Sequence, residues 1–366
     1  MNAIEPISDT PQDAVRMREL AAELAEAAFI GLDTEFLRER TYRAQLCLLQ
    51  LATPRRCECV DPLGNPDLEP LRDPLTQATP VKILHAARQD LEVLWPLFGA
   101  VAPVFDTQVA AGLTGMPAQV GYGELVRRLL GVELDKAHTR TDWSRRPLSP
   151  AQILYALDDV RYLGPLREAL LERLDQLGRV AWLEEEMLPL TTEESLFVAP
   201  DRAFERLKGL TDLDPDRQRL GKRLAAWREQ RAADRNRPRS WILEDAGLRA
   251  IVTRVPRDLR ELQGLADLNP GFIENSGTEV LRVVAEAEMP LTLPPLSGRT
   301  RPDPVLTEAV KKLGAVTRDV ATALGLSPEI LATRRDMEQI ARGERDVPVL
   351  RGWRRAAIGE ALLAAL

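Results

Sequence analysis

The sequence predicts a mixed α/β domain followed by two all-helical domains. Three apolar runs, 29–36, 44–53 and 56–61, are joined by short connections as in an antiparallel meander, and strand–helix alternation follows them. Beyond about residue 190 strand signals largely vanish, and helices rich in Arg, Leu and Ala take over. Five prolines in the 16 residues of Met289–Pro304 indicate an extended spacer within this helical half. The expected domain bounds are 1–195, 202–286 and 303–366.

The elements of the first domain follow from local signals. A helix should begin after Thr10, which is a good N-cap followed by proline, and run to about Ala27. A long helix is expected from Ser149 to about Gln176, with a kink at Gly164-Pro165. Between these two, we expect strands at 81–85 and 103–106 and helices at 88–98, 107–114 and 123–130.

Composition favours a cytoplasmic protein. Hydrophobic residues make up 45% of the chain, without the run of about 20 apolar residues that a membrane span requires, and the N-terminus lacks the features of a signal peptide. The three cysteines, Cys47, Cys57 and Cys59, suit neither a disulfide framework nor a zinc site, so we expect them to be buried thiols. The net charge of −7 argues against a nucleic-acid partner, but nine Lys/Arg residues stand against two acidic residues between Arg217 and Arg239.

Asp33 and Glu35 are the first candidate site residues. Side chains in a strand alternate between faces, so these two carboxylates should share one face of strand 29–36. Two like charges side by side repel each other, and a hard cation with oxygen ligands would relieve them. Taken alone, the pair also fits an edge strand that carries two solvated acids.

Further acidic residues follow downstream. Asp90 should lie near the start of helix 88–98, and Tyr155 and Asp159 should share one face of helix 149–176 because they are four residues apart. Taken alone, such a Tyr–Asp pair is more often a surface hydrogen bond than a catalytic pair, and Asp158 should point elsewhere as a surface charge. His85, ahead of Asp90, suits a buried structural histidine at least as well as a catalytic one.

Together these residues resemble the exonuclease motifs of the DEDD superfamily, in its tyrosine-bearing branch. The resemblance extends to Arg38, Arg40-Thr41-Tyr42, Gln45-Leu46, His85-Ala86, Asp90-Leu91-Glu92-Val93, Asp106-Thr107-Gln108, Asp135-Lys136 and Thr141-Asp142-Trp143. These matches are most like the ribonuclease D family and cover roughly residues 5–180. The resemblance implies a ribonuclease-H-like mixed sheet, in agreement with the meander.

The resemblance also implies a two-metal mechanism with Mg²⁺ or Mn²⁺, which prefer carboxylate and water oxygens. Asp33 would bridge both ions, Glu35 and Asp159 would hold the ion that binds the attacking water, and Asp90 would serve the second ion. Tyr155 would orient that water, because a phenol with a pKa near ~10 is a poor base at neutral pH. No other cofactor is implied.

The resemblance implies the substrate contacts less directly than it implies the metal ligands. Thr34 and Phe36 would seat the 3′-terminal nucleotide, and Lys136 and Arg140 would contact phosphate from a loop. The helical half resembles an HRDC domain at Leu224–Ala233 and Arg237–Leu243, and its basic residues, Arg223 and Arg228 among them, would contact RNA. A solvated helix face would also be rich in arginine. Residues 303–366 resemble a second, more divergent HRDC-like domain.

The resemblance implies a 3′→5′ exoribonuclease that releases nucleoside 5′-monophosphates and trims the 3′ ends of tRNA precursors and other small structured RNAs. We expect a monomer without an obligate protein partner. Two alternatives stay open. One is a DNA 3′→5′ exonuclease of the same superfamily, and the other is a non-catalytic nucleic-acid-binding adaptor that kept the fold.

Overall fold

The computed structural model describes residues 6–7, 10–135, 141–197, 199–210, 213–290 and 303–366. They form two compact units. The first contains the residues up to Leu37, Leu46–Leu196 and the C-terminal helices, and the second contains Arg38–Gln45 and the helices after Phe197. The C-terminal helices thus group with the sheet, and the division at 195 and 303 stays a prediction.

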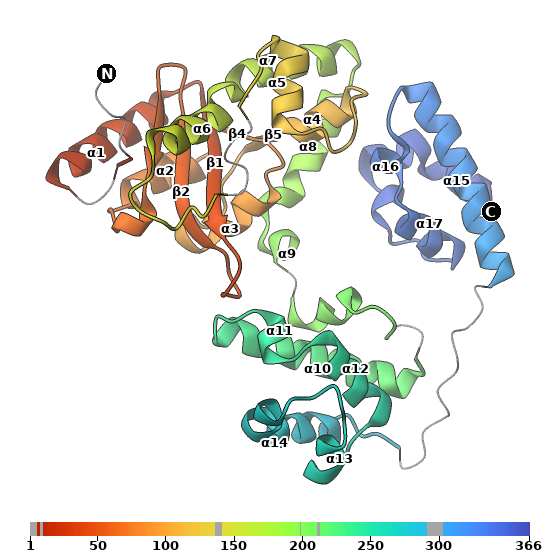
Figure 1. The fold of residues 1–366 in the computed structure, drawn as a ribbon. Helices are drawn as coiled ribbons and strands as arrows, with labels where there is room; N and C mark the ends of the chain where they lie inside the picture. The colour runs from red at the N-terminus through yellow and green to blue at the C-terminus, as the bar shows by residue number, and fades with distance from the viewer. Residues whose placement is uncertain (1–5, 8–9, 136–140, 198, 211–212, 291–302) are drawn as a thin grey trace. The chain divides into compact units, whose positions relative to one another are not determined.

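A five-stranded mixed sheet forms the centre of the first unit, in the order β3-β2-β1-β4-β5 (Figure 1). Its strands are β1 (Phe29–Leu37), β2 (Gln45–Ala52), β3 (Cys57–Val60), β4 (Val81–Leu84) and β5 (Val104–Asp106). β1 and β4 are parallel, as are β4 and β5, whereas β2 and β3 are antiparallel. This confirms the predicted mixed sheet, and each strand lies within about two residues of its predicted bounds. Cys47 and Cys59 are buried as expected, whereas Cys57 is half-buried.

Helices cover the sheet (Figure 1). The helices of this part of the chain are α1 (Pro11–Glu26), α2 (Arg72–Thr76), α3 (Arg88–Phe98), α4 (Thr107–Leu113), α5 (Tyr122–Leu130), α6 (Pro150–Arg161), α7 (Leu163–Gln176), α8 (Val180–Met187) and α9 (Glu193–Leu196). Short 3₁₀ turns stand at Pro62–Gly64 (η1), Glu69–Leu71 (η2) and Leu188–Thr191 (η3). The apolar face of α1, with Met17, Leu20 and Leu24, is buried, as its spacing requires.

The predicted helix 149–176 is in fact two helices, because the chain breaks at Tyr162. Pro165 cannot donate a backbone hydrogen bond to the preceding turn. At the break itself, the Tyr162 N–H donates to the hydroxyl of Tyr122 at 3.3 Å. Gly164 lies against β1, where a Cβ would stand 2.2 Å from the Phe29 ring. Both residues of the Gly-Pro pair therefore serve this junction.

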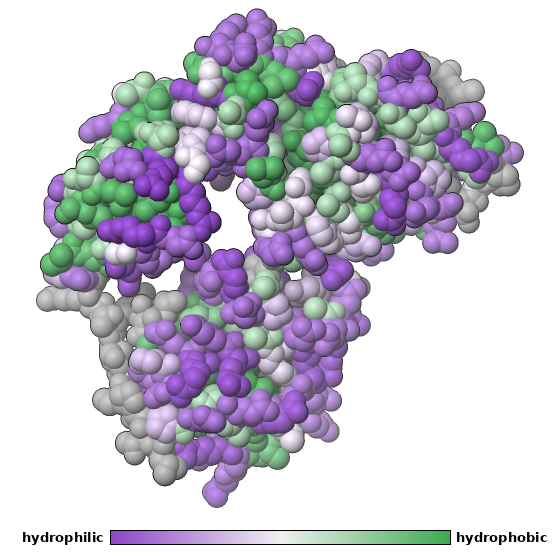
Figure 2. Space-filling view, turned by 180° about the vertical axis from the view of Figure 1, so that it is seen from behind, coloured by the Kyte–Doolittle hydropathy of each residue, from purple (hydrophilic) through white to green (hydrophobic). Residues whose placement is uncertain are grey.

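The second unit is helical. Its elements are η4 (Pro200–Arg206), α10 (Pro215–Asp234), α11 (Arg239–Ile242), α12 (Asp245–Arg254), α13 (Leu259–Gln263) and α14 (Pro270–Glu286). Leu220, Leu224, Leu248 and Val280 are among the residues of its own apolar core. The face of this unit seen at the bottom of Figure 2 is mostly hydrophilic. The segment ahead of this unit is structured in part, because α9 forms at Glu193–Leu196, Leu196 is buried, and η4 begins at Pro200.

The C-terminal helices of the first unit pack against α8. They are α15 (Pro304–Leu324), α16 (Pro328–Leu331), α17 (Arg334–Ala341), η5 (Pro348–Leu350), α18 (Gly352–Arg354), a π-helical turn η6 (Arg355–Gly359) and α19 (Glu360–Ala364). Trp353 stacks on Trp182 of α8 with ring centroids 4.3 Å apart, and its indole donates to Glu186 at 2.7 Å. Among the described residues, no helix combines the length and apolar character needed to cross a bilayer.

Candidate active site

The carboxyl end of β1 presents the first two acids. β1 pairs with β4 only over Phe29–Gly31, so Asp33 and Glu35 lie beyond the paired part of these parallel strands. This is the sheet edge at which α/β folds place their ligands. Both side chains are half-buried, whereas Thr34 between them is buried, as alternation requires.

Asp90 lies in the first turn of α3, and its placement depends on a tight turn after β4. Ala86 there has a left-handed backbone, with φ +57°. The Asp106 carboxylate holds the turn by accepting the N–H groups of Ala86 at 3.0 Å and Ala87 at 2.8 Å. Asp90 is buried and accepts a hydrogen bond from the Thr34 hydroxyl. The Thr34 hydroxyl therefore helps to position Asp90, and a role of Thr34 in seating the 3′-terminal nucleotide stays a prediction.

The helix α6 supplies Tyr155 and Asp159, one turn apart as predicted. A capping box between Ser149 and Gln152 fixes its start. Carboxylate oxygens of Asp33, Glu35 and Asp159 lie within 4.8 Å of one another. Tyr155 is hydrogen-bonded to Asp159, and its ring centroid lies 6.1 Å from that of the buried Trp143.

Repulsion within this acidic cluster is strong. Burial, and then the charges of Asp90, Asp159 and Glu35, raise the pKa of Asp33 well above its usual range. Burial and the Asp159 and Asp90 charges raise the pKa of Glu35 to about 8. Burial also raises the pKa values of Asp90 and Asp159 to about 7 each, with the neighbouring Asp158 adding to the effect on Asp159. The carboxyls therefore hold protons near neutral pH unless a cation neutralises them.

The donor set fits a hard divalent cation. Three carboxylate groups converge within 4.8 Å, and the buried Asp90 adds a fourth acid that acts electrostatically on the same cluster. All are oxygen donors, as Mg²⁺ and Mn²⁺ prefer. Asp33, Glu35 and Asp159 could ligate directly, with Asp90 beside them.

A second layer of contacts links the elements that carry these acids. The Tyr122 hydroxyl donates to the Asp158 carbonyl at 2.9 Å, at the end of α6, and its ring meets that of His85 edge-on with centroids 5.6 Å apart. His85 lies 2.9 Å from the Thr107 hydroxyl through Nδ1 and 3.0 Å from the Val120 carbonyl through Nε2. These partners, and a pKa lowered by burial, fit the predicted structural histidine.

Sequence reasoning missed one supporting pair, Asp61 and Arg146. The Arg146 guanidinium bonds both oxygens of Asp61, and also the carbonyls of Cys47 at 2.7 Å and Trp143 at 2.8 Å. It thereby fixes the segment that holds Trp143 against Tyr155. The two residues are 85 positions apart in sequence, and only the fold brings them together.

The predicted substrate contacts differ in where they lie in the structure. Lys136 and Arg140 lie outside the described residues. Phe36 is half-buried in β1, next to Glu35, and Arg223 is exposed on α10. Arg228 was a wrong choice: its side chain is only 7% exposed, and its guanidinium donates to the Leu243 carbonyl and the Asp245 carboxylate. A pocket of about 500 Å³ opens beside Tyr155 and Asp159, and Tyr122, Glu124, Arg127, Glu133, Leu134 and Asp135 line it further.

Comparison with known proteins shows which family has this arrangement of domains. A 3′-5′ exonuclease family model matches residues 9–175, and an HRDC domain model matches residues 217–284. Ribonuclease D of Gluconacetobacter diazotrophicus is 40% identical over 355 residues, which cover 93% of this chain and 88% of that protein. The chain belongs to the ribonuclease D family. Ribonuclease D of Granulibacter bethesdensis is 38% identical over 94% of this chain and 89% of its own.

The fold agrees with this membership in the ribonuclease D family of 3′→5′ exoribonucleases. The crystal structure of Escherichia coli RNase D, described as an exoribonuclease involved in structured RNA processing, superposes with a TM-score of 0.86 and 30% identity. The match covers 100% of this chain and 99% of that one. An exonuclease domain of this kind implies the use of divalent metal, and the cluster of Asp33, Glu35 and Asp159 is a candidate site for it.

Proposed function

We propose that this chain hydrolyses RNA from its 3′ end, using two divalent ions, and releases nucleoside 5′-monophosphates. We further propose 3′-extended tRNA precursors and other small structured RNAs as substrates, acted on by a monomer in the cytoplasm. Family membership supports the reaction. The observation that carries the site assignment is the convergence of Asp33, Glu35 and Asp159 within 4.8 Å.

In this proposal Asp33, Glu35 and Asp159 bind the metal directly, and Asp90 completes the site from α3. Bound divalent ions would lower the pKa of the attacking water and neutralise charge on the phosphoryl oxygens and the leaving 3′-oxygen. Thr34 holds the Asp90 carboxylate in place through its hydrogen bond. The acids are spread over β1, α3 and α6, so the fold, rather than one loop, fixes their spacing.

Tyr155 acts by orienting water, and its hydroxyl proton stays on the phenol. Burial and the nearby carboxylates of Asp159, Glu35 and Asp33 raise the pKa of Tyr155 far above neutral. A phenol in this environment donates a hydrogen bond but does not accept a proton at neutral pH. Trp143 and Asp159 restrict the ring and its hydroxyl, which suits a group that fixes the position of a nucleophile.

The test is digestion of a 3′-extended tRNA by the full chain, with the released products identified by mass. We expect mononucleotide 5′-phosphates released stepwise from the 3′ end with Mg²⁺ or Mn²⁺ and no products in EDTA. Titrating each ion separately would give the preferred metal. Faster hydrolysis of a matched DNA oligonucleotide would assign the DNA exonuclease alternative, and no hydrolysis with either ion would leave the non-catalytic adaptor.

A further inference from the structure

The cationic residues of α10 and of the segment that leads into α11 serve two different purposes. Five of the nine Lys/Arg side chains between Arg217 and Arg239 form ion pairs inside the second unit: Arg217–Asp214, Arg219–Asp216, Arg228–Asp245, Arg231–Glu279 and Arg239–Glu229. The other four are exposed: Lys222, Arg223, Arg235 and Arg237. Two of these four stand at the carboxyl end of α10, where the chain turns into α11.

Trp241 lies next to this pair of arginines. It is 59% exposed, whereas the other five tryptophans of the chain are buried or half-buried. The Arg237 guanidinium lies over its ring, 5.7 Å from the ring centroid. An exposed indole beside cations provides a flat surface on which a base can stack, with positive charge close by for its phosphate.

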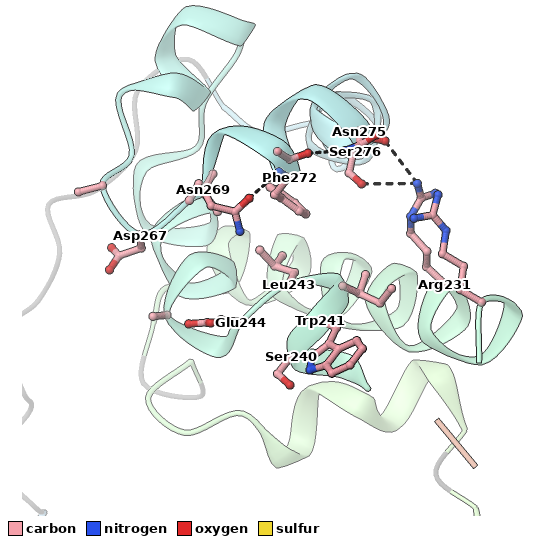
Figure 3. Close-up of a pocket in the computed structure, with 16 residues that line it drawn as sticks. Arg231, Ser240, Trp241, Leu243, Glu244, Asp267, Asn269, Phe272, Asn275 and Ser276 are labelled. Atoms are coloured by element: carbon pink, nitrogen blue, oxygen red, sulfur yellow. Dashed lines mark hydrogen bonds between the residues drawn. The ribbon is translucent and has the colours of Figure 1, made fainter. Parts of the chain in front are cut away.

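A groove of about 730 Å³ opens beside Trp241 (Figure 3). Trp241 lies on its α11 side, and Phe272, Asn275 and Ser276 of α14 lie opposite (Figure 3). The volume falls within the range of about 300–1,000 Å³ found for sites of small organic molecules. A single nucleoside therefore fits the space.

Polar groups across the groove suit the edge of a base. The Asn269 side chain accepts from the Phe272 N–H at 2.7 Å through its carbonyl oxygen, which leaves its amide N–H groups as possible donors. The Asn275 amide nitrogen donates to the Gly271 carbonyl at 2.7 Å, which leaves its oxygen as a possible acceptor. Donors and acceptors together match the edge of an unpaired base. Glu244 and Asp267 line the groove as well, so the phosphate belongs near Arg235 and Arg237.

We propose that this groove binds one unpaired nucleotide of the RNA substrate, with its base stacked on Trp241 and its phosphate near Arg235 and Arg237. The proposal rests on the proposed ribonuclease function, because it identifies a second contact with the same substrate. It moves the RNA contact of the HRDC domain from Arg228, which is internal, to the carboxyl end of α10.

The probe is a 5′-fluorescein-labelled 20-nucleotide oligoadenylate, bound to the full chain in EDTA and followed by fluorescence anisotropy. Trp241→Ala should weaken binding about 10-fold, the loss expected for one stacked base. Trp241→Phe, which keeps an aromatic face, should stay within about threefold of wild type. Leu259→Ala, which removes an exposed apolar side chain outside the groove, is the matched control and should bind normally.

Salt dependence separates stacking from charge. The double variant Arg235→Ala/Arg237→Ala should flatten the slope of log K against log salt by about 0.7, since each phosphate of a single strand that the protein neutralises contributes about 0.7. Trp241→Ala should leave the slope unchanged. Circular dichroism melting of each variant would confirm that it folds.

Unchanged affinity of Trp241→Ala, or equal losses for Trp241→Ala and Trp241→Phe, would overturn the proposal. Unchanged RNA affinity together with altered sedimentation of Trp241→Ala would assign the groove to a protein contact instead. The wild-type digestion assay keeps the two proposals distinguishable. Digestion by wild type with no binding effect at Trp241 rejects the groove alone, whereas absence of digestion rejects the nuclease reaction whatever the binding data show.

Discussion

Like charges gather at the end of β1, whereas opposite charges pair along α10. Within the described residues, burial raises the pKa values of Asp33, Glu35, Asp90 and Asp159, and the like charges of their neighbours raise those of Asp33 and Glu35 further. Arg217 and Arg228 of α10 and Arg239 of α11 each have a carboxylate partner in their own unit. Hence the abundance of a charge type does not identify a binding surface. The informative observation is whether the fold leaves the charge uncompensated.

The largest effect that tests this contrast is expected at two adjacent acids. Asp159→Asn should lower the rate of RNA hydrolysis at least about 1,000-fold, because a lost metal ligand removes several kcal/mol of transition-state stabilisation. Asp158→Asn is the matched control. The Asp158 side chain pairs with Arg161 and does not belong to the group of converging carboxylates. The rate of RNA hydrolysis by Asp158→Asn should therefore change less than about threefold. Comparable losses in both variants would remove the distinction between the two acids.

A smaller effect is expected at Arg228, where a substitution should change the stability of the protein and not its RNA binding. Arg228→Ala should lower the free energy of unfolding by about 2 kcal/mol, since it deletes charge-assisted hydrogen bonds to the Leu243 carbonyl and Asp245. Urea denaturation would measure the loss, with Arg223→Ala as an exposed control within about 0.5 kcal/mol of wild type. The salt dependence of RNA binding should stay unchanged in Arg228→Ala. A flattened slope would restore Arg228 as a phosphate contact.

The smallest effect is expected at Tyr122, which supports α6 from outside the cluster. Tyr122→Phe removes the hydrogen bonds to the Asp158 carbonyl and from the Tyr162 N–H while keeping the ring against His85. We expect kcat to fall about fivefold, equivalent to about 1 kcal/mol, with KM within a factor of two. A change in KM alone would indicate that Tyr122 contacts the substrate through the neighbouring pocket.

The acidic site could be predicted from sequence because local patterns place each acid on its element and the resemblance to the DEDD superfamily joins them into one site. The positions of Asp33, Glu35 and Asp159 follow from strand alternation and helix spacing, and the predicted strand bounds proved accurate. The contacts that hold them could not be predicted. The Asp61–Arg146 pair and the Tyr122–Asp158 bond join residues 85 and 36 positions apart, and no local pattern marks either pair.

The basic helix shows the opposite case. Its composition predicted RNA contact, yet composition does not reveal which arginines meet a carboxylate after folding. Arg228 faces Asp245, and Arg231 faces Glu279, 48 residues downstream. The break at Tyr162 was visible as a Gly-Pro signal, but the contacts of this junction with Phe29 of β1 and Tyr122 of α5 were not.

The central claim, that the β1 cluster is incomplete without cations, is tested most directly by thermal unfolding with and without Mn²⁺. The raised pKa values of Glu35, Asp90 and Asp159 mean that the folded state binds protons which the unfolded state releases. In the metal-free protein, proton binding by these carboxyls stabilises the folded state in full below about pH 4. This stabilisation is lost as the pH rises through 7–8.

Mn²⁺ should therefore raise Tm at pH 8 far more than at pH 5, where protons compete for the carboxylates. Asp33→Asn should remove most of the increase at pH 8. Both results together would support the account. An equal rise in Tm for wild type and Asp33→Asn, or no rise at pH 8, would contradict it.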